Sequence, residues 1–410
     1  MSKTALLFDV DGTLWDTTNS TYKAENIITK KYNLPEVTKE TVQQCFGYNR
    51  VESAKVYFPT LDLDTAIEYK IEADKEKIRI INEENIDASY PKTKETLELL
   101  SKDYDLYIVS NTGNVLYLEA FVNSSNTKEL FKDLVAASAL KISKAEAIRK
   151  VMRDNKIEKA IYIGDTIKDK EAANEAGIPF VQALYGFDKD LNEKYKIDSI
   201  DKLPDVLKQI NVKSVLFATG NESKSKRFSI GLLKKDIIVL TLKDIDLDID
   251  VEENGKTAIE NAMIKAKAYA DKVDIPVFAM DDTLYFDDVP EEKQPGLFVR
   301  RVNGKRLNDE EMIEHYSGLA KEYGKDGKLT CRWIYGMALI NNGKEATYTW
   351  SKEDFYIVEK RSDKVDPGYP LNSISINKKV NKYFTDITPE DKKLLAEDES
   401  DVVDFIASHI

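Results

Sequence analysis

The sequence predicts an α/β protein of two domains, the first a doubly wound parallel sheet that carries an inserted helical cap. Three observations support this fold class. The 410 residues exceed what one hydrophobic core usually supports. Short apolar runs of β type alternate with helical patterns, an order that favours parallel sheets. After residue 187 a charged segment and a short helical pattern come before a new β-type run, which places a domain boundary near residues 211–213.

The first domain is predicted at residues 1–210, with polar residues at the ends of its strands. Asp9 follows the first β-type run, Ser110 and Asn111 end the second, and Asp165 follows the third. Open α/β sheets bind ligands beyond the carboxyl ends of their strands, so we expect one site there. The four runs are ALLF at 5–8, LYIVS at 106–110, AIYIG at 160–164 and IPFVQA at 178–183.

Residues 17–90, between the first two strands, contain no convincing strand. They are rich in helical patterns such as STYKAENIITKKY and LDTAIEYKIEADKEKIRIINEEN. We interpret this segment as a helical cap inserted into the first domain.

The second domain is predicted at residues 213–410 and opens with the strand SVLFA at 214–218. A strand candidate IIVLTL and a long helical pattern KTAIENAMIKAKAYADKV follow. The next strand, PVFAM, is expected to end at Asp281 and Asp282. The Asn-Asn-Gly sequence at 341–343 predicts the turn of a β-hairpin.

The composition disfavours several classes of function. With 42% hydrophobic and 32% charged residues and no long apolar run, we expect a cytoplasmic protein without membrane contact. A net charge of −13 argues against nucleic acid polymers as partners. Two cysteines and two histidines provide no disulfide framework, zinc site or histidine triad. We therefore expect carboxylates and lysines to act on small phosphorylated molecules.

Asp9 and Asp11 have the spacing of a phosphoryl-transfer pair. One carboxylate at a strand end can bind Mg²⁺ and attack phosphorus, and the second can carry the proton of the leaving group. An ordinary Asp-Gly turn after a strand is the competing interpretation of DVDGT alone.

Further elements of the first half favour the chemical interpretation. Ser110 or Asn111 could donate a hydrogen bond to a phosphoryl oxygen, and Lys144 could neutralise its charge. The run GDTIKD adds Asp165 and Asp169 as carboxylates for Mg²⁺.

Over residues 1–210 the sequence resembles the haloacid dehalogenase-like (HAD) phosphohydrolases. The resemblance lies in the DxDGT motif, the serine strand end, the lysine, the GDxxxD run and AANEAGIPFV. It implies an aspartyl-phosphate mechanism. Lys141 is an alternative for the family lysine. We favour Lys144, because Lys144 opens a helix. The implied roles are Asp9 as nucleophile, Asp11 as general acid and base, Ser110 and Lys144 as phosphoryl contacts, and Asp9, Asp11, Asp165 and Asp169 as the Mg²⁺ site.

The cap is expected to choose the substrate in this family, and the sequence leaves that substrate open. The segment FGYNRVE at 46–52 looks like a cap loop that faces the site. Arg50 in this loop is a candidate anion contact, with an ordinary surface arginine as the alternative. The cap contains no histidine, which disfavours the related sugar-phosphate mutases, whose caps carry one for proton transfer.

The second domain contains another candidate phosphate site. TGNESK at 219–224 follows a strand and precedes a helix, so its backbone N–H groups and the side chains of Thr219, Asn221 and Lys224 could hold a phosphate chain. A plain turn is the alternative interpretation.

Two further elements could complete this site. Glu260 and Lys265 on one predicted helix would supply a metal ligand and an anion partner, or an ordinary ion pair on a solvated face. Asp281 and Asp282, which are expected to end a strand, are suited to hold Mg²⁺ and activate water.

Residues 213–395 resemble the inosine-triphosphate pyrophosphatase-like (Ham1-like) family, which implies an α/β domain with a mixed sheet. The resemblance continues in QPGLFVRRV and TPEDKK. It implies hydrolysis of a nucleoside triphosphate to monophosphate and pyrophosphate, and pairing into a homodimer. The implied roles are Glu260 and Asp282 for Mg²⁺ and the activated water, Lys224 and Lys265 for the triphosphate, Asp281 as a supporting carboxylate, and Pro295, Gly296, Arg301 and Lys392 at further family positions.

Two departures leave the base preference open. Ala396, Glu397 and Asp398 stand where the family has a base-reading Ser-His-Arg, and only Gly368 and Tyr369 remain of a Gly-Tyr-Asp-Pro segment. Tyr369 can stack on a base. The acids could accept hydrogen bonds from a different base, a hypothesis that an unchanged base preference in Glu397→Ala and Asp398→Ala would contradict.

The leading hypothesis is a bifunctional hydrolase, in which a nucleotide pyrophosphatase is joined to a phosphatase that acts on one of its products. The alternative is a phosphatase regulated by a second half that binds nucleotides without turnover. A third hypothesis, two unrelated activities in one chain, predicts that the halves work equally well when cut apart at residue 212.

Overall fold

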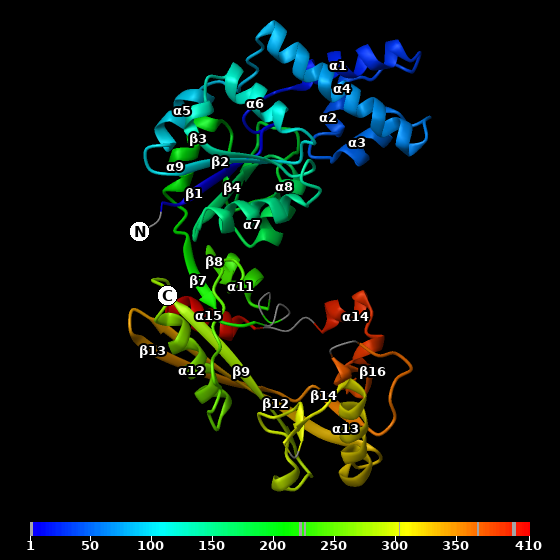
Figure 1. Cartoon of the computed structure of the whole chain (residues 1–410), viewed down its shortest axis with the longest axis vertical. Coiled ribbons are helices and arrows are strands. Elements are labelled where there is room, and N and C mark those ends of the chain that lie inside the picture. Colours follow the sequence, from blue (N-terminus) through cyan, green and yellow to red (C-terminus); the bar gives the residue numbers. More distant parts are fainter. Residues whose placement is uncertain (1–2, 221–223, 225–226, 303, 367–368, 396–398) are drawn as a thin grey trace. The chain divides into compact units, whose positions relative to one another are not determined.

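The computed structural model describes residues 3–220, 224, 227–302, 304–366, 369–395 and 399–410 (Figure 1). The chain divides into two compact units. The first contains Met1–Ser214 and Leu232–Leu247, and the second contains Val215–Gly231 and Asp248–Ile410. The domain limits of 1–210 and 213–410 stay a prediction, because the two units are not continuous in sequence.

A sheet of six parallel strands forms the centre of the first unit, in the order β3-β2-β1-β4-β5-β6. The central strand β1 (Ala5–Phe8) lies between β2 (Asp105–Ser110) and β4 (Ala160–Gly164), and each of its residues is buried. Helices α5 and α6 cover one face and α7 and α8 the other (Figure 1), so the doubly wound sheet is confirmed. The other elements are β3 (Phe131–Ala136), β5 (Phe180–Ala183), β6 (Lys196–Ile197), α5 (Thr93–Leu100), α6 (Val115–Ser124), α7 (Lys144–Asp154), α8 (Ile167–Ala176) and α9 (Leu203–Leu207).

The strand β3 was not among the predicted strands. It lies at the edge of the sheet, where only β2 pairs with it. Lys132 and Asp133 in its middle are exposed. An edge strand does not need the apolar run by which the central strands are recognised, so its polar sequence hid it.

Four helices form the cap between β1 and β2, as predicted. They are α1 (Thr18–Lys31), α2 (Lys39–Gln44), α3 (Arg50–Tyr57) and α4 (Leu63–Glu84). Asn49 and Glu52 form a capping box that starts α3 at Arg50. The cap has its own core, which includes Ile28, Val42, Tyr57, Phe58 and Ala66.

The second sheet has eight strands and is mixed, which confirms the predicted sheet type, and all its strands except β8 lie wholly or mostly in the second unit. The strand order is β16-β15-β14-β12-β9-β7-β8, and β13 pairs with β12. The pairing of β7 with β9 is parallel, and those of β12 with β9, β13 and β14 are antiparallel. The strands are β7 (Lys213–Phe217), β8 (Ile237–Thr241), β9 (Val277–Phe286), β12 (Lys328–Asn341), β13 (Lys344–Lys352), β14 (Phe355–Val358), β15 (Ser375–Asn377) and β16 (Lys382–Tyr383).

The remaining named elements of the second unit are shorter sheet segments and helices. The two-stranded sheet β10 (Arg301–Val302) and β11 (Lys305–Arg306) stands apart from the large sheet. None of the helices in the described part of the chain combines the length and the apolar composition needed to cross a membrane. The helices are α11 (Ser229–Leu233), α12 (Ala258–Ala270), α13 (Asp309–Tyr323), α14 (Pro389–Leu394) and α15 (Ser400–Ser408).

The prediction that a strand ends at Asp281 and Asp282 is wrong. β9 continues through both aspartates to Phe286. Each aspartate has a partner on β12: Asp281 is opposite Gly336, and Asp282 is opposite Tyr335. The long antiparallel partner holds two residues of low strand propensity in extended conformation, so tertiary pairing overrides the local signal.

The predicted hairpin turn is confirmed. β12 and β13 pair up to Asn341 opposite Lys344, which leaves Asn342 and Gly343 as a two-residue loop. Their φ angles are 50° and 75°. Two successive positive φ angles are the requirement of a type I′ turn, which Asn-Gly meets at low cost.

Candidate active sites

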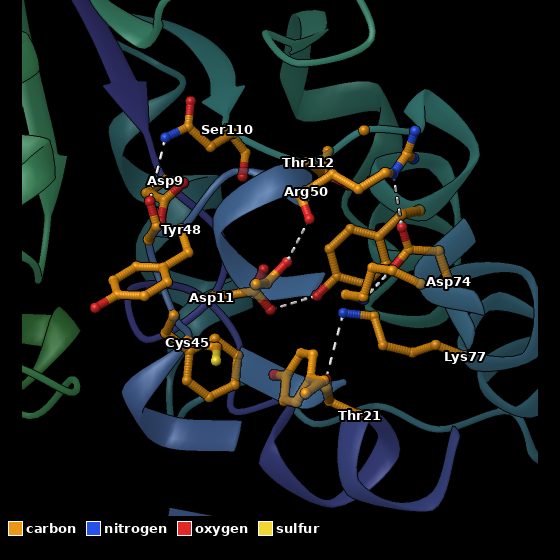
Figure 2. Close-up of a pocket in the computed structure, with 18 of the residues that line it drawn as sticks. Asp9, Asp11, Thr21, Cys45, Tyr48, Arg50, Asp74, Lys77, Ser110 and Thr112 are labelled. Atoms are coloured by element: carbon orange, nitrogen blue, oxygen red, sulfur yellow. Dashed lines mark hydrogen bonds and ion pairs between the residues drawn. The ribbon is translucent and has the colours of Figure 1, made fainter. Parts of the chain in front are cut away.

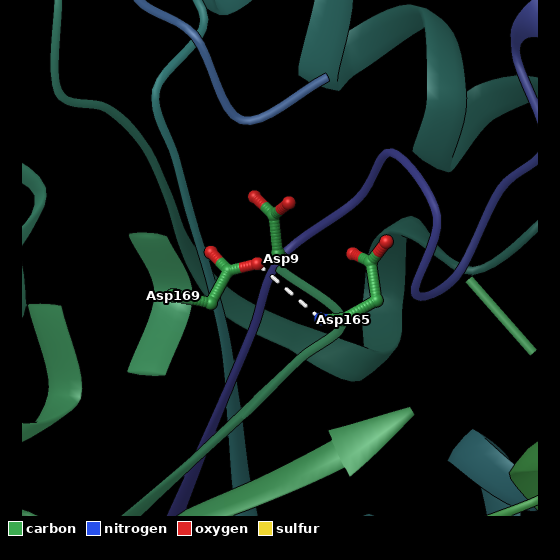
Figure 3. Close-up of side chains that lie close together, drawn as sticks. All are labelled: Asp9, Asp165 and Asp169. Carbon is green, nitrogen blue, oxygen red and sulfur yellow. Dashed lines mark hydrogen bonds between the residues drawn. The ribbon is translucent and has the colours of Figure 1, made fainter. Parts of the chain in front are cut away.

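Three carboxylates meet at one edge of the sheet in the first unit. Asp9 follows β1, Asp165 follows β4, and Asp169 lies in the first turn of α8. All three are buried, and each offers a carboxylate oxygen within 4.8 Å of the others (Figure 3). β1 and β4 are parallel neighbours, so their carboxyl ends lie together, as the sequence predicted.

Short hydrogen bonds hold two of these carboxylates in place. Thr166 caps α8 and donates its hydroxyl to Asp169 at 2.7 Å. Thr13 donates to Asp165 at 3.0 Å. Gly12 of the motif has φ of 83°, and a Cβ atom there would stand 2.2 Å from Asp165 Oδ2. The glycine of DVDGT is therefore required by the close approach of the two loops.

Lys144 is the cation of this cluster. Its Nζ lies 3.0 Å from Asp9 Oδ1 and also forms an ion pair with Asp169, and all three side chains are buried. Ser143 caps α7 and so places Lys144 at the start of this helix. Lys141, the alternative named above, is exposed.

Burial sets the protonation equilibria of the cluster. It raises the pKa of Asp9 to about 7, although Lys144 acts in the opposite direction. Burial also raises the pKa of Asp165, and the neighbouring Asp169 adds to this effect. Burial alone would lower the pKa of Lys144, but Asp169 and Asp9 outweigh it, and the lysine stays charged. Three buried carboxylates with one lysine form a site that favours a bound cation.

Asp11 is separate from the three clustered carboxylates. Its Oδ1 accepts hydrogen bonds from the hydroxyls of Thr17 and Tyr117. Burial and the charge of Asp11 raise the pKa of Tyr117 well above its ordinary value, so its phenol remains a donor. Neither donor was among the predicted site residues. Tyr117 lies on α6, 106 residues from Asp11, and no sequence pattern links them.

A small cavity joins these groups to the cap (Figure 2). Its volume is about 90 Å³. Asp9, Asp11 and Lys144 line one side, together with Ser110 and Asn111 beyond β2. The amide of Asn111 donates to the carbonyl oxygen of Gly47 in the cap at 3.3 Å. The cap side of the cavity is lined by Thr21, Cys45, Phe46, Gly47, Tyr48, Arg50, Ser53, Tyr57, Lys70, Asp74 and Lys77.

In the second unit, the two adjacent aspartates face opposite sides of the sheet, because neighbouring residues of a strand alternate. Asp281 accepts a hydrogen bond from Asn261 of α12 at 2.9 Å, and Lys265 of the same helix lies 3.5 Å away. Asp282 points to the other side, where it forms an ion pair with Lys224. Glu260 is exposed at the start of α12.

The structure thus brings the predicted residues together in two separate groups, Lys224 with Asp282 and Lys265 with Asp281. Glu253 also pairs with Lys265 at 3.2 Å. Among the residues that the structure describes, neither group gathers three metal-ligating side chains. Of the other predicted residues, Thr219 follows β7, and Arg301 in β10 and Lys392 in α14 are exposed. Tyr369 is 46% exposed. The predicted residues outside the described part of the chain are Asn221, Gly368, Ala396, Glu397 and Asp398.

A cavity of about 300 Å³ lies on the Asp282 side of the sheet. Tyr335, which pairs with Asp282 across the strands, is part of its wall. Arg227 lies 4.7 Å above the Tyr335 ring and forms an ion pair with Glu399 at 2.6 Å, and Lys352 also binds Glu399 at 3.0 Å. These residues were not predicted. The cavity is lined by Arg227, Trp333, Tyr335, Lys352, Asp354, Phe355, Leu371, Asn372, Ser375 and Phe384.

Comparisons with known proteins agree with both halves of this description. Residues 6–183 match the haloacid dehalogenase-like hydrolase family, and residues 215–397 match the Ham1 family. A dITP/XTP pyrophosphatase of Christiangramia forsetii is 33% identical over 150 residues, which cover 37% of this chain and 76% of the relative. One of Oceanobacillus iheyensis is 29% identical over 186 residues, which cover 45% of this chain and 92% of the relative.

A haloacid dehalogenase-like hydrolase of Streptococcus pneumoniae has a solved structure that aligns with a TM-score of 0.44 and 23% identity, over 50% of this chain and 98% of that one. The fold, the sites and the family matches define a hydrolytic enzyme built from two units. The chain belongs to the Ham1 family through its second unit, and its first unit matches the haloacid dehalogenase-like hydrolase family.

Proposed function

We propose that the chain is a bifunctional Mg²⁺-dependent hydrolase. Its first unit would be a phosphomonoesterase that forms an aspartyl-phosphate intermediate, and its second a nucleoside triphosphate pyrophosphatase. The observation that carries the first proposal is the arrangement of Asp9, Lys144 and Asp11 around one cavity at the ends of parallel strands. The possible pairing of two chains through the second unit stays a prediction.

The donor set of the first site suits Mg²⁺. Asp9, Asp165 and Asp169 offer only carboxylate oxygens, the ligands that this cation prefers. Asp11 was also predicted as a metal ligand, but it is not one of the three clustered carboxylates. The bound cation would neutralise the carboxylates and the charge of a phosphoryl group.

The side chains have distinct roles in the proposed phosphatase reaction. Asp9 attacks phosphorus, while Asp11 gives a proton to the leaving oxygen and later takes one from water. Thr17 and Tyr117 orient Asp11 through its Oδ1. Lys144, Ser110 and Asn111 would hold the phosphoryl oxygens. Lys144 already neutralises part of the buried charge, which keeps Asp9 in place before substrate binds.

The proposed reaction of the second unit converts a nucleoside triphosphate to monophosphate and pyrophosphate. The predicted phosphate-binding cations are Lys224 and Lys265, and the predicted ligands of Mg²⁺ and the attacking water are Asp282 and Glu260. Lys224 and Asp282 lie on one face of the sheet, and α12, with Lys265 and Glu260, lies on the other. The cavity beside Asp282 is large enough for a small-molecule ligand and has aromatic walls. Relatives named dITP/XTP pyrophosphatases suggest non-standard purine nucleotides as substrates.

One observation favours a second candidate function for this unit. Asp282 and α12, which carries Glu260, lie on opposite faces of the sheet, and the described residues show no group of three metal ligands there. This geometry favours a unit that binds a nucleotide without hydrolysing it and regulates the phosphatase.

Product analysis with purified full-length protein tests both functions. The protein is incubated with Mg²⁺ and a panel of standard and modified nucleoside triphosphates, or with a simple phosphate ester. Asp9→Asn should lower ester hydrolysis by roughly a thousandfold or more and leave triphosphate consumption unchanged. Asp282→Asn should have the reverse effect.

Two further variants sharpen this experiment. Asp281→Asn distinguishes the two faces of the sheet, and it should reduce triphosphate turnover less than Asp282→Asn does. Asp205→Asn, at an exposed position of α9, is the matched control and should match the wild type. Tight nucleotide binding without any consumption of the panel would favour the regulatory candidate. Loss of neither activity in Asp9→Asn would contradict the proposed nucleophile.

A further inference from the structure

The cavity at Asp9 and Asp11 is small. Its volume of about 90 Å³ compares with about 300 Å³ beside Asp282 in the second unit. Small-molecule pockets usually occupy roughly 300–1,000 Å³, and one water in the liquid takes roughly 30 Å³. The first cavity can therefore hold a phosphoryl group with a compact leaving group, and a ribose and a base would have to extend beyond it.

A wider groove lies next to this cavity and does not change that conclusion. It has a volume of about 680 Å³ and passes Asn111 and Lys144. Asp9 and Asp11 line the small cavity and are not part of the groove wall. The reacting phosphorus must reach Asp9, so the small cavity holds the phosphoryl end of the substrate, and only a larger substrate would use the groove.

The cap side of this cavity carries three cations, Arg50, Lys70 and Lys77, shown in part in Figure 2. Two carboxylates neutralise part of their charge. Glu25 lies 2.9 Å from Lys70, and Asp74 binds both Lys70 and Arg50, the latter at 3.2 Å. One positive charge therefore remains at this wall of the cavity.

Lys77 is the one of these three cations that forms no ion pair with a carboxylate of the described residues, and Asp11 is the carboxylate whose charge acts on it most strongly. Its Nζ lies 3.4 Å from the Thr21 hydroxyl and 3.8 Å from the centre of the Tyr117 ring. A half-buried ammonium with one long hydrogen bond gains strongly from an anion in the cavity. Lys77 thus points to a ligand with a negative charge near the cap.

The position of Lys77 identifies which part of the substrate is charged. Tyr117, whose ring it covers, donates its hydroxyl to Asp11, the proposed acid for the leaving group. The guanidinium of Arg50 lies against Gly113 in the loop after β2, where a Cβ atom would stand 2.1 Å from Nη2. Lys77 therefore lies on the side on which the leaving group departs and favours an anionic leaving group, whereas Arg50 lies beside the loop that follows β2.

We propose that the substrate of the first unit is inorganic pyrophosphate, an inference that rests on the proposed function of both units. Pyrophosphate joins a phosphoryl group to an anionic leaving group of minimal size. The proposed reaction of the second unit releases it, so one product of that unit is the substrate of the other. Short phosphorylated carboxylic acids share the same chemistry, and the experiment below separates them from pyrophosphate.

The proposed reaction balances with water as the only co-reactant. A carboxylate oxygen of Asp9 bonds to one phosphorus, and the bond from that phosphorus to the bridging oxygen breaks. The bridging oxygen keeps the electron pair, takes the proton of Asp11 and leaves within the first phosphate. Water then attacks the phosphorus on Asp9 and gives a proton to Asp11, which releases the second phosphate and the Asp9 carboxylate.

Phosphate release by the full-length protein with Mg²⁺ tests this assignment. The substrates are pyrophosphate, phosphoglycolate as the short phosphorylated acid, acetyl phosphate as a compact donor whose far end is an uncharged methyl group, and nucleoside monophosphates. We expect kcat/KM for pyrophosphate to exceed that for each monophosphate by roughly a hundredfold, because the leaving group of pyrophosphate is small and anionic and lies within reach of Lys77, whereas a nucleoside would extend out of the cavity.

Variants of the cap lysine provide the second measurement. Lys77→Gln should lower kcat/KM for pyrophosphate by roughly tenfold or more, because a charge-assisted contact is lost, and change acetyl phosphate hydrolysis by less than about twofold. Lys77→Arg should restore part of the loss. Lys75→Gln, an exposed lysine on the same helix, is the control and should match the wild type. Unchanged acetyl phosphate hydrolysis also shows that Lys77→Gln is folded.

Three outcomes would overturn the assignment. The first is a kcat/KM for monophosphates equal to that for pyrophosphate. The second is a higher kcat/KM for phosphoglycolate than for pyrophosphate. The third is a Lys77→Gln variant in which kcat/KM falls equally for pyrophosphate and acetyl phosphate. Each of these leaves a working Asp9 phosphatase. Failure of the proposed phosphatase function would give a different result. In that case Asp9→Asn would change the hydrolysis of neither acetyl phosphate nor pyrophosphate, or neither substrate would be hydrolysed.

Discussion

At the residue scale, the first site combines groups that are costly to bury with groups that offset the cost. Asp9, Asp165 and Asp169 would repel one another without Lys144 and a cation. The sequence predicted all four residues, because each stands in a recognisable motif. It did not predict Thr17 or Tyr117 as partners of Asp11, because an ordinary hydroxyl on a helix carries no such signal.

The raised pKa of Asp9 predicts how stability depends on pH in the absence of metal. Burial raises the pKa of Asp9 to about 7, whereas the unfolded chain has the ordinary value for aspartate. Between roughly pH 4 and pH 7 the folded state therefore binds more protons than the unfolded state, and the free energy of unfolding falls as pH rises. Asp165, whose pKa is also raised, acts in the same direction.

Thermal unfolding in EDTA across this pH range measures the effect. The melting temperature of the first unit should fall as pH rises, and Asp9→Asn should make the slope smaller. Added Mg²⁺ should stabilise the wild type more at the upper end of the range, because ionised carboxylates bind it. A melting temperature that rises with pH in EDTA would contradict the buried environment of Asp9.

At the element scale, pairing between β9 and β12 decides which side chains of the second unit meet. Asp281 faces α12 and Asp282 faces Lys224 because consecutive residues of one strand point to opposite sides. A sequence pattern shows only that two aspartates are adjacent. The long partner strand, which lies about fifty residues further along the chain, extends β9 past them and divides their roles.

Gly336 holds α12 close to the sheet, which predicts a specific defect in Gly336→Ala. A Cβ atom at this position would stand 2.4 Å from the backbone nitrogen of Ile259 in α12. The helix would have to move away from Asp281, at a cost of roughly 1–3 kcal/mol in the free energy of unfolding. Triphosphate turnover should fall with it.

Gly343→Ala provides the matched control in the same hairpin. Gly343 has φ of 75°, and a Cβ atom at this position would meet no atom of the described residues within 4 Å, so the substitution strains only the turn. It should cost roughly 1–2 kcal/mol in stability and leave turnover of the folded protein unchanged. Denaturant unfolding and initial rates separate the two variants, and equal turnover in both would contradict a role for the α12 contact.

At the scale of the whole molecule, the chain carries two units with cavities of different size and character. The first is narrow and charged, and the second is wider and partly aromatic. These differences favour two successive reactions on one triphosphate, in which the second unit acts first. They give no support to two copies of one activity.

The proposed sequence of reactions predicts a stoichiometry. With Mg²⁺ and a triphosphate that the second unit accepts, the wild type should release two phosphates for each nucleoside monophosphate formed. Asp9→Asn should release one pyrophosphate instead, with no phosphate, because only the second reaction is lost. Chromatography of the nucleotide and a phosphate assay measure both products. Release of free nucleoside by the wild type would show that the monophosphate is the substrate of the first unit.

The sequence by itself determined the two α/β folds and the helical cap, and it predicted the carboxylates and the lysine that lie together in the first unit. Buried central strands leave apolar runs, and a catalytic carboxylate must follow such a run directly, so both signals are local. The tertiary structure alone decided the edge strand β3, the opposite faces of Asp281 and Asp282, and the pairing of Lys77 with Tyr117 beside Asp11. These features depend on contacts between segments far apart in the chain, and the residue types involved are the same ones that occur on any solvated surface.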